Sequence, residues 1–186
     1  MEYVSRYESP LGGIILECDG EALTGLRFDD RKRFPGASYG AYGKKKPPVF
    51  EQTEKWLDIY FSGKDPGFTP PLKMDTTPFR RAVWEIMLTI PYGKTTTYGQ
   101  IAKMIAEQKG IGKMSAQAVG GAVGHNSIAL IIPCHRVIGT DGSLTGYGGG
   151  IDRKAKLLTL EKSGTAKPFA PEKKRVSDRR KDHDEP

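Results

Sequence analysis

Ile132-Pro133-Cys134-His135-Arg136-Val137-Ile138-Gly139 is the stretch that most restricts the fold and chemistry of this chain. An apolar run, residues 128–132, leads into it, and a glycine-rich loop follows it. A thiol becomes a strong nucleophile only as the thiolate, and neighbouring cations favour that ionisation. Here an imidazole and a permanent guanidinium stand within two residues of the Cys134 sulfur. The cysteine of an isolated Cys-His pair is more often a buried structural residue than a nucleophile. The surrounding sequence is therefore needed to distinguish the two.

Two short helices are predicted upstream, and together they form a helix-turn-helix pattern. Thr97 and Gln100 fit a capping box that opens a helix running to about residue 108. The glycine-containing segment 109–113 interrupts it, and Ser115 fits the N-cap of a second helix, residues 116–124. Such a pair commonly places its second helix in a DNA groove, although this turn is longer than usual.

In this order, these elements resemble the catalytic domain of the O6-alkylguanine-DNA alkyltransferases, also called methylated-DNA–protein-cysteine methyltransferases. The resemblance implies an α+β protein. A small, ribonuclease-H-like sheet-plus-helix domain would be followed by a mostly helical, winged helix-turn-helix-like DNA-binding catalytic domain. The matching residues are 78–90, 91–93, 97–102, 118–122, 126, 132–139, 145–150 and 154–161.

The chain divides into three predicted parts. These are an N-terminal α/β domain, residues 1–72, a catalytic DNA-binding domain, residues 73–166, and a charged tail, residues 167–186. The tail has little apolar content, so we expect it to be disordered. The N-terminal domain resembles the family only in pattern.

Short β-rich segments and one amphipathic segment predict the N-terminal domain. Phe50, Leu57 and Phe61 form an apolar stripe, which Tyr60 widens, and such a stripe is far more typical of a core than of a ligand site. Residues 29–48 are polar and rich in Gly, Pro and Lys, which predicts a mobile loop. The predicted strands are residues 3–8, 13–18 and 23–28, and the predicted helix is residues 50–61.

Two further helices are predicted in the catalytic domain. Thr77 and Pro78 fit the N-cap and first residue of an amphipathic helix, residues 78–89. Asp152 fits the N-cap of a last helix, which ends before Gly164.

Charge and composition favour a DNA-binding protein inside the cell. The 186 residues carry a formal net charge of +7, which favours a polyanionic partner, although a solvated basic surface gives the same balance. No N-terminal segment resembles a signal peptide, and no apolar run is long enough to span a membrane. Cys18 and Cys134 make no disulfide framework. We therefore expect reduced thiols and a cytoplasmic protein, associated with the nucleoid in a prokaryote.

The resemblance implies repair of DNA by direct reversal of damage. The protein would flip O6-alkylguanine, and also O4-alkylthymine, out of the duplex. The alkyl group would then pass irreversibly to the sulfur of Cys134, so that each molecule acts once and needs no cofactor. The implied partner is double-stranded DNA containing O6-alkylguanine, without membrane contact, and we expect a monomer.

The resemblance also assigns roles around the nucleophile. His135 is the implied base, acting through a bridging water, and Glu161 is the residue that orients it. Asn126 matches the asparagine that braces the active-site segment. Adjacent side chains of an extended strand point to opposite faces. Cys134 and His135 can therefore cooperate only if the chain turns there or a water intervenes.

Other residues are assigned to the flipped base and the DNA. Tyr98 would crowd the target phosphate and donate to guanine N3. Tyr147 would wall the pocket, the N–H of Gly148 would donate to O6, and the carbonyls of Cys134 and Val137 would accept from the exocyclic amine. The full set of implied substrate and DNA contacts is Tyr98, Gln117, Ala118, Gly121, Arg136, Val137, Tyr147 and Gly148.

The chain departs from the family pattern in three places. Gln117 stands where an arginine usually fills the vacated base stack, and glutamine brings no charge. Gly148 replaces a frequent small polar residue, which favours a pocket open to bulkier alkyl groups. The N-terminal half offers only Cys18 and no histidine, too few ligands for the structural zinc of some relatives, so we expect no metal there.

Three alternative functions stay open at this point. Proteins that recognise the same lesion without accepting the alkyl group commonly have Trp in place of the cysteine, so Cys134 argues against that class. A thiol hydrolase would turn over an acyl substrate. A transcriptional regulator would bind a specific operator and ignore alkylated bases.

Overall fold

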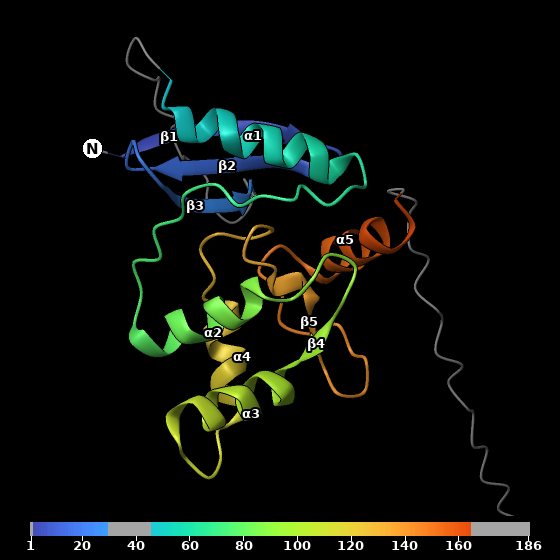
Figure 1. Ribbon diagram of the computed structural model, residues 1–186. Helices are drawn as coiled ribbons and strands as arrows, with labels where there is room; N and C mark the ends of the chain where they lie inside the picture. The colour runs from blue at the N-terminus through green and yellow to red at the C-terminus, as the bar shows by residue number, and fades with distance from the viewer. Residues whose placement is uncertain (1, 30–45, 165–186) are drawn as a thin grey trace, which may run out of the picture.

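A computed structural model describes residues 2–29 and 46–164 (Figure 1). Most of the predicted loop at residues 29–48 and the whole predicted tail at residues 167–186 lie outside the described residues. The described chain forms a three-stranded sheet with one helix, followed by a helical unit that contains a small two-stranded parallel sheet.

The N-terminal unit is an antiparallel sheet covered by a helix. Its elements are β1 (Tyr3–Ser9), β2 (Gly12–Cys18), β3 (Leu23–Phe28) and α1 (Pro48–Phe61). The strands pair in chain order, and α1 packs on β1 and β2. The sequence prediction is confirmed, except that α1 begins at Pro48, where the fixed φ of proline suits a first helical turn.

The outer edge of β3 pairs with two distant segments. The backbone of Leu23 donates to Pro71 at 2.8 Å and accepts from Lys73 at 2.9 Å. Leu26 pairs with the segment 127–129, donating at 2.9 Å and accepting at 2.8 Å. These bonds satisfy backbone groups that an open edge would expose. They also attach the loop before Cys134 to the N-terminal sheet.

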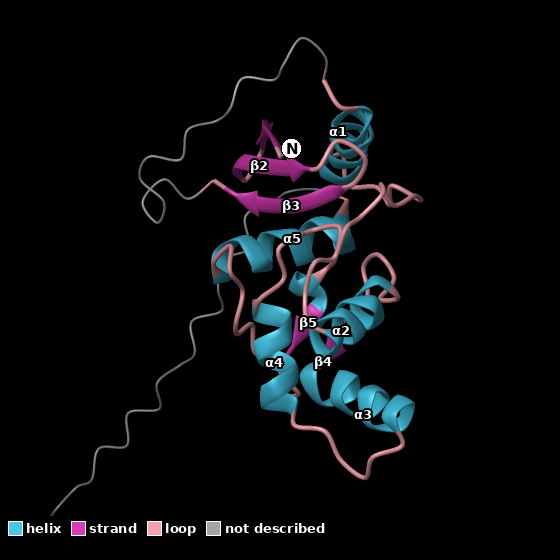
Figure 2. Ribbon diagram, turned by 90° about the vertical axis from the view of Figure 1, so that its left-hand side faces the viewer, coloured by secondary structure: helices cyan, strands magenta, loops and turns pink. Residues whose placement is uncertain are grey.

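The second unit is mostly helical. Its elements are α2 (Pro78–Leu88), β4 (Thr96–Thr97), α3 (Tyr98–Lys109), α4 (Ala116–Gly124), a 3₁₀ turn (Cys134–Arg136), β5 (Val137–Ile138) and α5 (Ile151–Ser163). Helices α2, α3 and α4 pack on one another, and β4 pairs with β5 in parallel. Helix α5 lies between the N-terminal sheet and these helices (Figures 1 and 2).

The helix-turn-helix is built as its capping residues predict. The Thr97 hydroxyl accepts from the N–H of Gln100 at 3.1 Å, and the Gln100 side chain accepts from the N–H of Thr97 at 2.9 Å. Gly110, with φ of 62°, ends α3 in the left-handed conformation. Ser115 caps α4 by accepting from the N–H of Ala118 at 3.3 Å.

One predicted cap was wrong. Gly150, with φ of 91°, is the N-cap of α5, and the helix begins at Ile151. Asp152 therefore lies in the first turn, where its negative charge still favours the helix N-terminus. Position 150 has φ of 91° and ψ of 146°, a combination close to a region that only glycine adopts readily, and the helix starts at the next residue.

A continuous hydrophobic core joins the two units. It contains Phe50 and Leu57 of α1 together with Leu157 and Leu160 of α5. Within the described residues, no helix is long and apolar enough to cross a membrane. Nor do those residues bring three or more His, Cys, Asp or Glu side chains together in a way that could hold a metal ion.

Loss of the Ser115 cap should weaken the second helix of the helix-turn-helix. Helix α4 has nine residues, three of them glycine, so its intrinsic propensity is poor. We expect Ser115→Ala to lower the free energy of unfolding by about 1 kcal/mol, measured by urea denaturation. Ser115→Asp keeps a capping oxygen and should stay near wild type. Equal midpoints for the two variants would show that the cap contributes nothing.

Candidate active site

The backbone turns at the cysteine instead of running straight. Cys134–Arg136 form one turn of 3₁₀ helix, and the N–H of Cys134 donates to the carbonyl of Ile132 at 2.8 Å. Leu130, with φ of 68°, takes a left-handed conformation that a leucine rarely adopts. Such strain is tolerated where surrounding structure enforces it. Because of the turn, Cys134 and His135 are not held on opposite faces of a strand.

Asn126 spans the loop that carries the cysteine. Its Nδ2 donates to the carbonyl of Ile132 at 2.7 Å, and its Oδ1 accepts from the N–H of Ile128 at 3.1 Å. The Asn126 amide also favours the thiolate form of Cys134 and so acts to lower the pKa of that thiol. One amide therefore holds both ends of the loop 128–132 that leads to Cys134.

The Cys134 thiol is buried, with 7% of the residue exposed. Burial raises the pKa of the thiol, and this effect outweighs the groups that favour the thiolate. Those groups are the Asn126 amide, the Lys154 ammonium and the backbone N–H groups of Cys134 and His135. The resting sulfur is therefore protonated at neutral pH, with the groups that stabilise its anion already in place.

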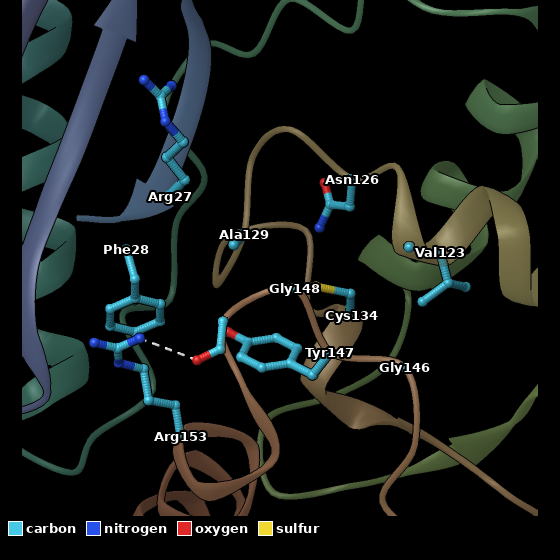
Figure 3. A pocket seen from close by; sticks show the side chains of 12 residues that line it. Arg27, Phe28, Val123, Asn126, Ala129, Cys134, Gly146, Tyr147, Gly148 and Arg153 are labelled. Carbon is cyan, nitrogen blue, oxygen red and sulfur yellow. Dashed lines mark hydrogen bonds between the residues drawn. The ribbon is translucent and has the colours of Figure 1, made fainter. Parts of the chain in front are cut away.

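The sulfur faces a cavity of about 130 Å³ between the two units (Figure 3). Tyr147 lies beside Cys134, and Phe28 of β3 forms the opposite wall with the Arg153 guanidinium 4.6 Å above its ring. Gly149 is required between these rings. A Cβ there would lie 2.6 Å from the Tyr147 ring and 3.0 Å from that of Phe28.

Behind the cysteine, one buried carboxylate accepts hydrogen bonds from four residues on three segments of the chain. Glu161 Oε1 accepts from His135 Nε2 at 2.5 Å and from the hydroxyl of Tyr60 at 2.8 Å. Its Oε2 accepts from Arg136 Nε at 2.9 Å and from the N–H of Gly93 at 3.0 Å. The Glu161 side chain has no exposed area. The histidine and the acid assigned from sequence are thus in direct contact.

These hydrogen bonds help to determine the protonation states of Glu161 and His135. Burial raises the pKa of Glu161, but hydrogen bonds from His135 and Arg136 outweigh it and lower the pKa to about 2. Burial lowers the pKa of His135, although Glu161 opposes this. At neutral pH the acid is ionised and the imidazole neutral. Because the Glu161 carboxylate accepts a hydrogen bond from Nε2, the single ring proton of the neutral imidazole is on Nε2. Nδ1 is therefore the basic nitrogen. Nδ1 is buried, without a hydrogen-bond partner among the described residues.

Lys154 is a site residue that the sequence reasoning missed. It is fully buried, and its Nζ donates to the carbonyls of Val137 at 2.6 Å and Thr145 at 2.9 Å. The Lys154 ammonium therefore links the glycine-rich loop to β5 through these two hydrogen bonds. Helical spacing could have revealed it, because Lys154 shares a face of α5 with Leu157 and Glu161.

Tyr98 and the exposed Gln117 border a surface groove beside α4, also lined by Gly120, Thr145 and Gly146. The Tyr98 hydroxyl donates to the carbonyl of Thr145 at 2.9 Å. Gly146 lines both this groove and the cysteine cavity, so the two adjoin. Its φ of 69° favours glycine, and a Cβ there would lie 3.3 Å from the Tyr98 hydroxyl oxygen.

One of the residues assigned to substrate or DNA contact, Arg136, lies elsewhere than that contact would require. Arg136 is buried, directed at Glu161, and donates to the carbonyl of Ile90 at 2.7 Å, so it does not face the groove. The carbonyl of Val137 already accepts from Lys154 and retains one free lone pair. The exposed residues Ala118, Gly121 and Gly148 remain accessible, the first two on α4.

Acid should destabilise the protein through Glu161. The carboxyl pKa is 4.5 ordinarily and about 2 in the fold, so its stabilisation is complete above pH 4.5 and disappears as pH falls towards 2. Near neutrality, Glu161→Gln should unfold more easily than wild type by about 3 kcal/mol, because Arg136 loses its buried counter-charge. Urea unfolding at a series of pH values should show this gap closing in acid.

The exposed Glu107 of α3 provides the matched control. Its side chain is 66% exposed, so Glu107→Gln should stay close to wild type at every pH. If the gap between Glu161→Gln and wild type were the same at pH 7 and pH 3, the carboxyl pKa would not be depressed in the fold.

Comparison with known proteins adds to the geometry. Residues 3–74 match the family model described as the ribonuclease-like domain of 6-O-methylguanine DNA methyltransferase, and residues 78–163 match the model for its DNA binding domain. The chain is 44% identical over 163 residues to a methylated-DNA–protein-cysteine methyltransferase of Mycobacterium tuberculosis, covering 88% of this chain and 94% of the relative. A Haemophilus influenzae protein of the same name is 39% identical over 161 residues, 86% of each chain.

Solved structures agree with these relationships. A crystal structure of Mycobacterium tuberculosis OGT in complex with DNA is 43% identical, with a TM-score of 0.71 over 88% of this chain and 94% of that one. The O6-methylguanine-DNA methyltransferase of Pyrococcus kodakaraensis is 27% identical, with a TM-score of 0.59 over 87% and 99% of the two chains. Both domains, in the same order, are therefore shared over most of the chain, which belongs to the 6-O-methylguanine DNA methyltransferase family.

Proposed function

We propose that this protein repairs DNA by transferring the alkyl group of O6-alkylguanine to its own Cys134. The observation that carries the proposal is the placement of the Cys134 sulfur. Cys134 lines a cavity together with Asn126, and the next residue is a neutral histidine whose Nε2 donates to Glu161. The relatives' shared name, methylated-DNA–protein-cysteine methyltransferase, supports the same reaction.

The transfer is a single displacement. The Cys134 sulfur attacks the alkyl carbon, a C–S bond forms, and the bond from that carbon to guanine O6 breaks with its electron pair on oxygen. His135 Nδ1 receives the thiol proton through a bridging water, and the departing base takes up one proton to become guanine, so that the thiol proton is balanced overall. The thioether is stable in water, so each molecule reacts once. No cofactor takes part.

Repair in a duplex requires the base to leave the stack. The groove bordered by Tyr98 and Gln117 receives the DNA backbone, and α4 presents small residues, Ala118 and Gly121, for a close approach. The flipped base passes Gly146 into the cavity, where Tyr147 and the N–H of Gly148 meet it. Gln117 enters the vacated stack without adding charge.

We also propose where the protein acts, its oligomeric state, a second substrate and how it binds DNA. The protein acts as a cytoplasmic monomer, and it also accepts O4-alkylthymine, which presents an alkyl group on an equivalent oxygen. Binding is driven largely by phosphates, in keeping with the formal net charge of +7, and has little sequence preference.

Mass spectrometry of the intact protein tests the transfer. After mixing with a duplex carrying one O6-methylguanine, wild type should gain one CH₂ unit, and peptide mapping should place it on Cys134. Cys134→Ser should bind the duplex and gain nothing. Cys18→Ala removes the other cysteine, which is buried in β2, and should react like wild type. Lesion binding without methylation of wild type would instead indicate a recognition-only protein.

A second test concerns the residue that enters the stack. Gln117→Arg adds one cation at the groove, so we expect tighter duplex binding and a log K against log salt slope steeper by about 0.9. Gln108→Arg adds the same charge on an exposed position of α3 outside the residues that border the groove. Fluorescence anisotropy should show a smaller change for this control. Identical slopes for the two variants would place Gln117 outside the DNA contact.

A further inference from the structure

The active site includes a tyrosine from the other structural unit. Tyr60 lies in the last turn of α1 and is fully buried. Its hydroxyl donates to Glu161 Oε1 at 2.8 Å, and the same oxygen lies 3.2 Å from His135 Nε2. The hydroxyl therefore touches both partners of the pair that prepares the base, although it is 101 residues from Glu161.

Packing holds this hydroxyl in position. The Tyr60 ring stacks on Trp56 at 5.1 Å between centroids, and it meets Phe61 and Tyr92 edge-on at 5.3 and 6.0 Å. A ring fixed on three sides has little freedom to turn its hydroxyl elsewhere. Core packing alone requires only the ring, and a phenylalanine would supply it.

We propose that Tyr60 is a positioning residue of the alkyl transfer, which sets the basicity of His135 by donating its hydroxyl proton to Glu161. The inference rests on the proposed function, since it concerns the base of that reaction. Tyr60 does not touch the reacting atoms and acts through the carboxylate.

The direction of the effect follows from charge. Burial raises the pKa of Tyr60 well above its usual value, and Glu161 adds to this, so the hydroxyl is a permanent donor. By donating, it withdraws electron density from Glu161 and weakens the attraction of the carboxylate for a proton on His135. His135 consequently stays neutral, as a base must. The other ionisable groups around the pair are Arg136, Cys134, Lys154, Tyr92 and Tyr147.

Tyr60→Phe tests the hydroxyl while keeping the ring. Without the donated proton, Glu161 attracts the His135 proton more strongly, so less of the histidine is neutral at a given pH. We expect the acid limb of the pH–rate profile for methyl transfer from O6-methylguanine duplex to move to higher pH by about one unit, so that transfer slows about 10-fold on that limb and little on the plateau above it. Duplex affinity should not change, because Tyr60 is remote from the groove.

Tyr92→Phe is the matched control. The Tyr92 hydroxyl is buried and has no hydrogen-bond partner in the part of the chain that the structure describes. Its removal from a ring that packs on Tyr60 should leave both the rate and the acid limb as in wild type. A purely structural Tyr60 would lower the folded fraction without moving the acid limb, and that result overturns the proposal.

A phenol at position 60 that donates a stronger hydrogen bond should shift the basicity of His135 in the opposite direction. Replacing Tyr60 with 3-fluorotyrosine keeps the ring and makes the phenol more acidic, so the acid limb should move to lower pH. This variant also keeps the test decisive if Tyr60→Phe folds poorly; an unmoved limb would refute the proposal. Wild type that transfers no methyl group would defeat the proposed function itself. Normal transfer by wild type with unmoved limbs in both variants would defeat only the role of Tyr60.

Discussion

The buried carboxylate of Glu161 is the interaction on which the site depends. An ion removed from water is stable only when its lone pairs are fully satisfied. Glu161 meets this requirement with donors from Tyr60, Gly93, His135 and Arg136. Those donors come from α1, from the loop before β4 and from the turn that carries the cysteine. The buried carboxylate is therefore compatible only with the complete fold, in which it holds His135 and Arg136 in the turn that carries Cys134.

It follows that the N-terminal unit is part of the active site, not only a support for it. The backbone of Leu26 pairs with the loop before Cys134, and Phe28 lines the cavity. The Tyr60 hydroxyl contacts both His135 and Glu161. The hydrophobic core continues across the boundary. A rearrangement between the units would alter the cavity and the basicity of the histidine together, so geometry and proton affinity are coupled here.

Features that depend on near neighbours could be predicted from the sequence. The caps at Thr97 and Ser115 each involve residues three positions apart, and both form as their residue types require. The Asp152 cap failed because the incoming loop, with its positive φ at Gly150, decided where α5 begins. Tyr60 and Lys154 were missed for a different reason. Helical spacing places both side chains on buried helix faces, but the groups that they hydrogen-bond lie outside their own helices and cannot be identified from local sequence.

Burial has opposite consequences for the two reacting groups, and together they suit a protein that reacts once. It raises the pKa of the Cys134 thiol and lowers that of His135, so both rest in their neutral forms. A neutral, buried thiol reacts slowly with small electrophiles. The Asn126 amide and the Lys154 ammonium favour the thiolate, so the sulfur can attack a correctly placed alkyl carbon while its proton passes to His135. The Cys134 thiol therefore reacts mainly when an alkylated base occupies the cavity beside Tyr147, and few molecules lose their sulfur to other electrophiles.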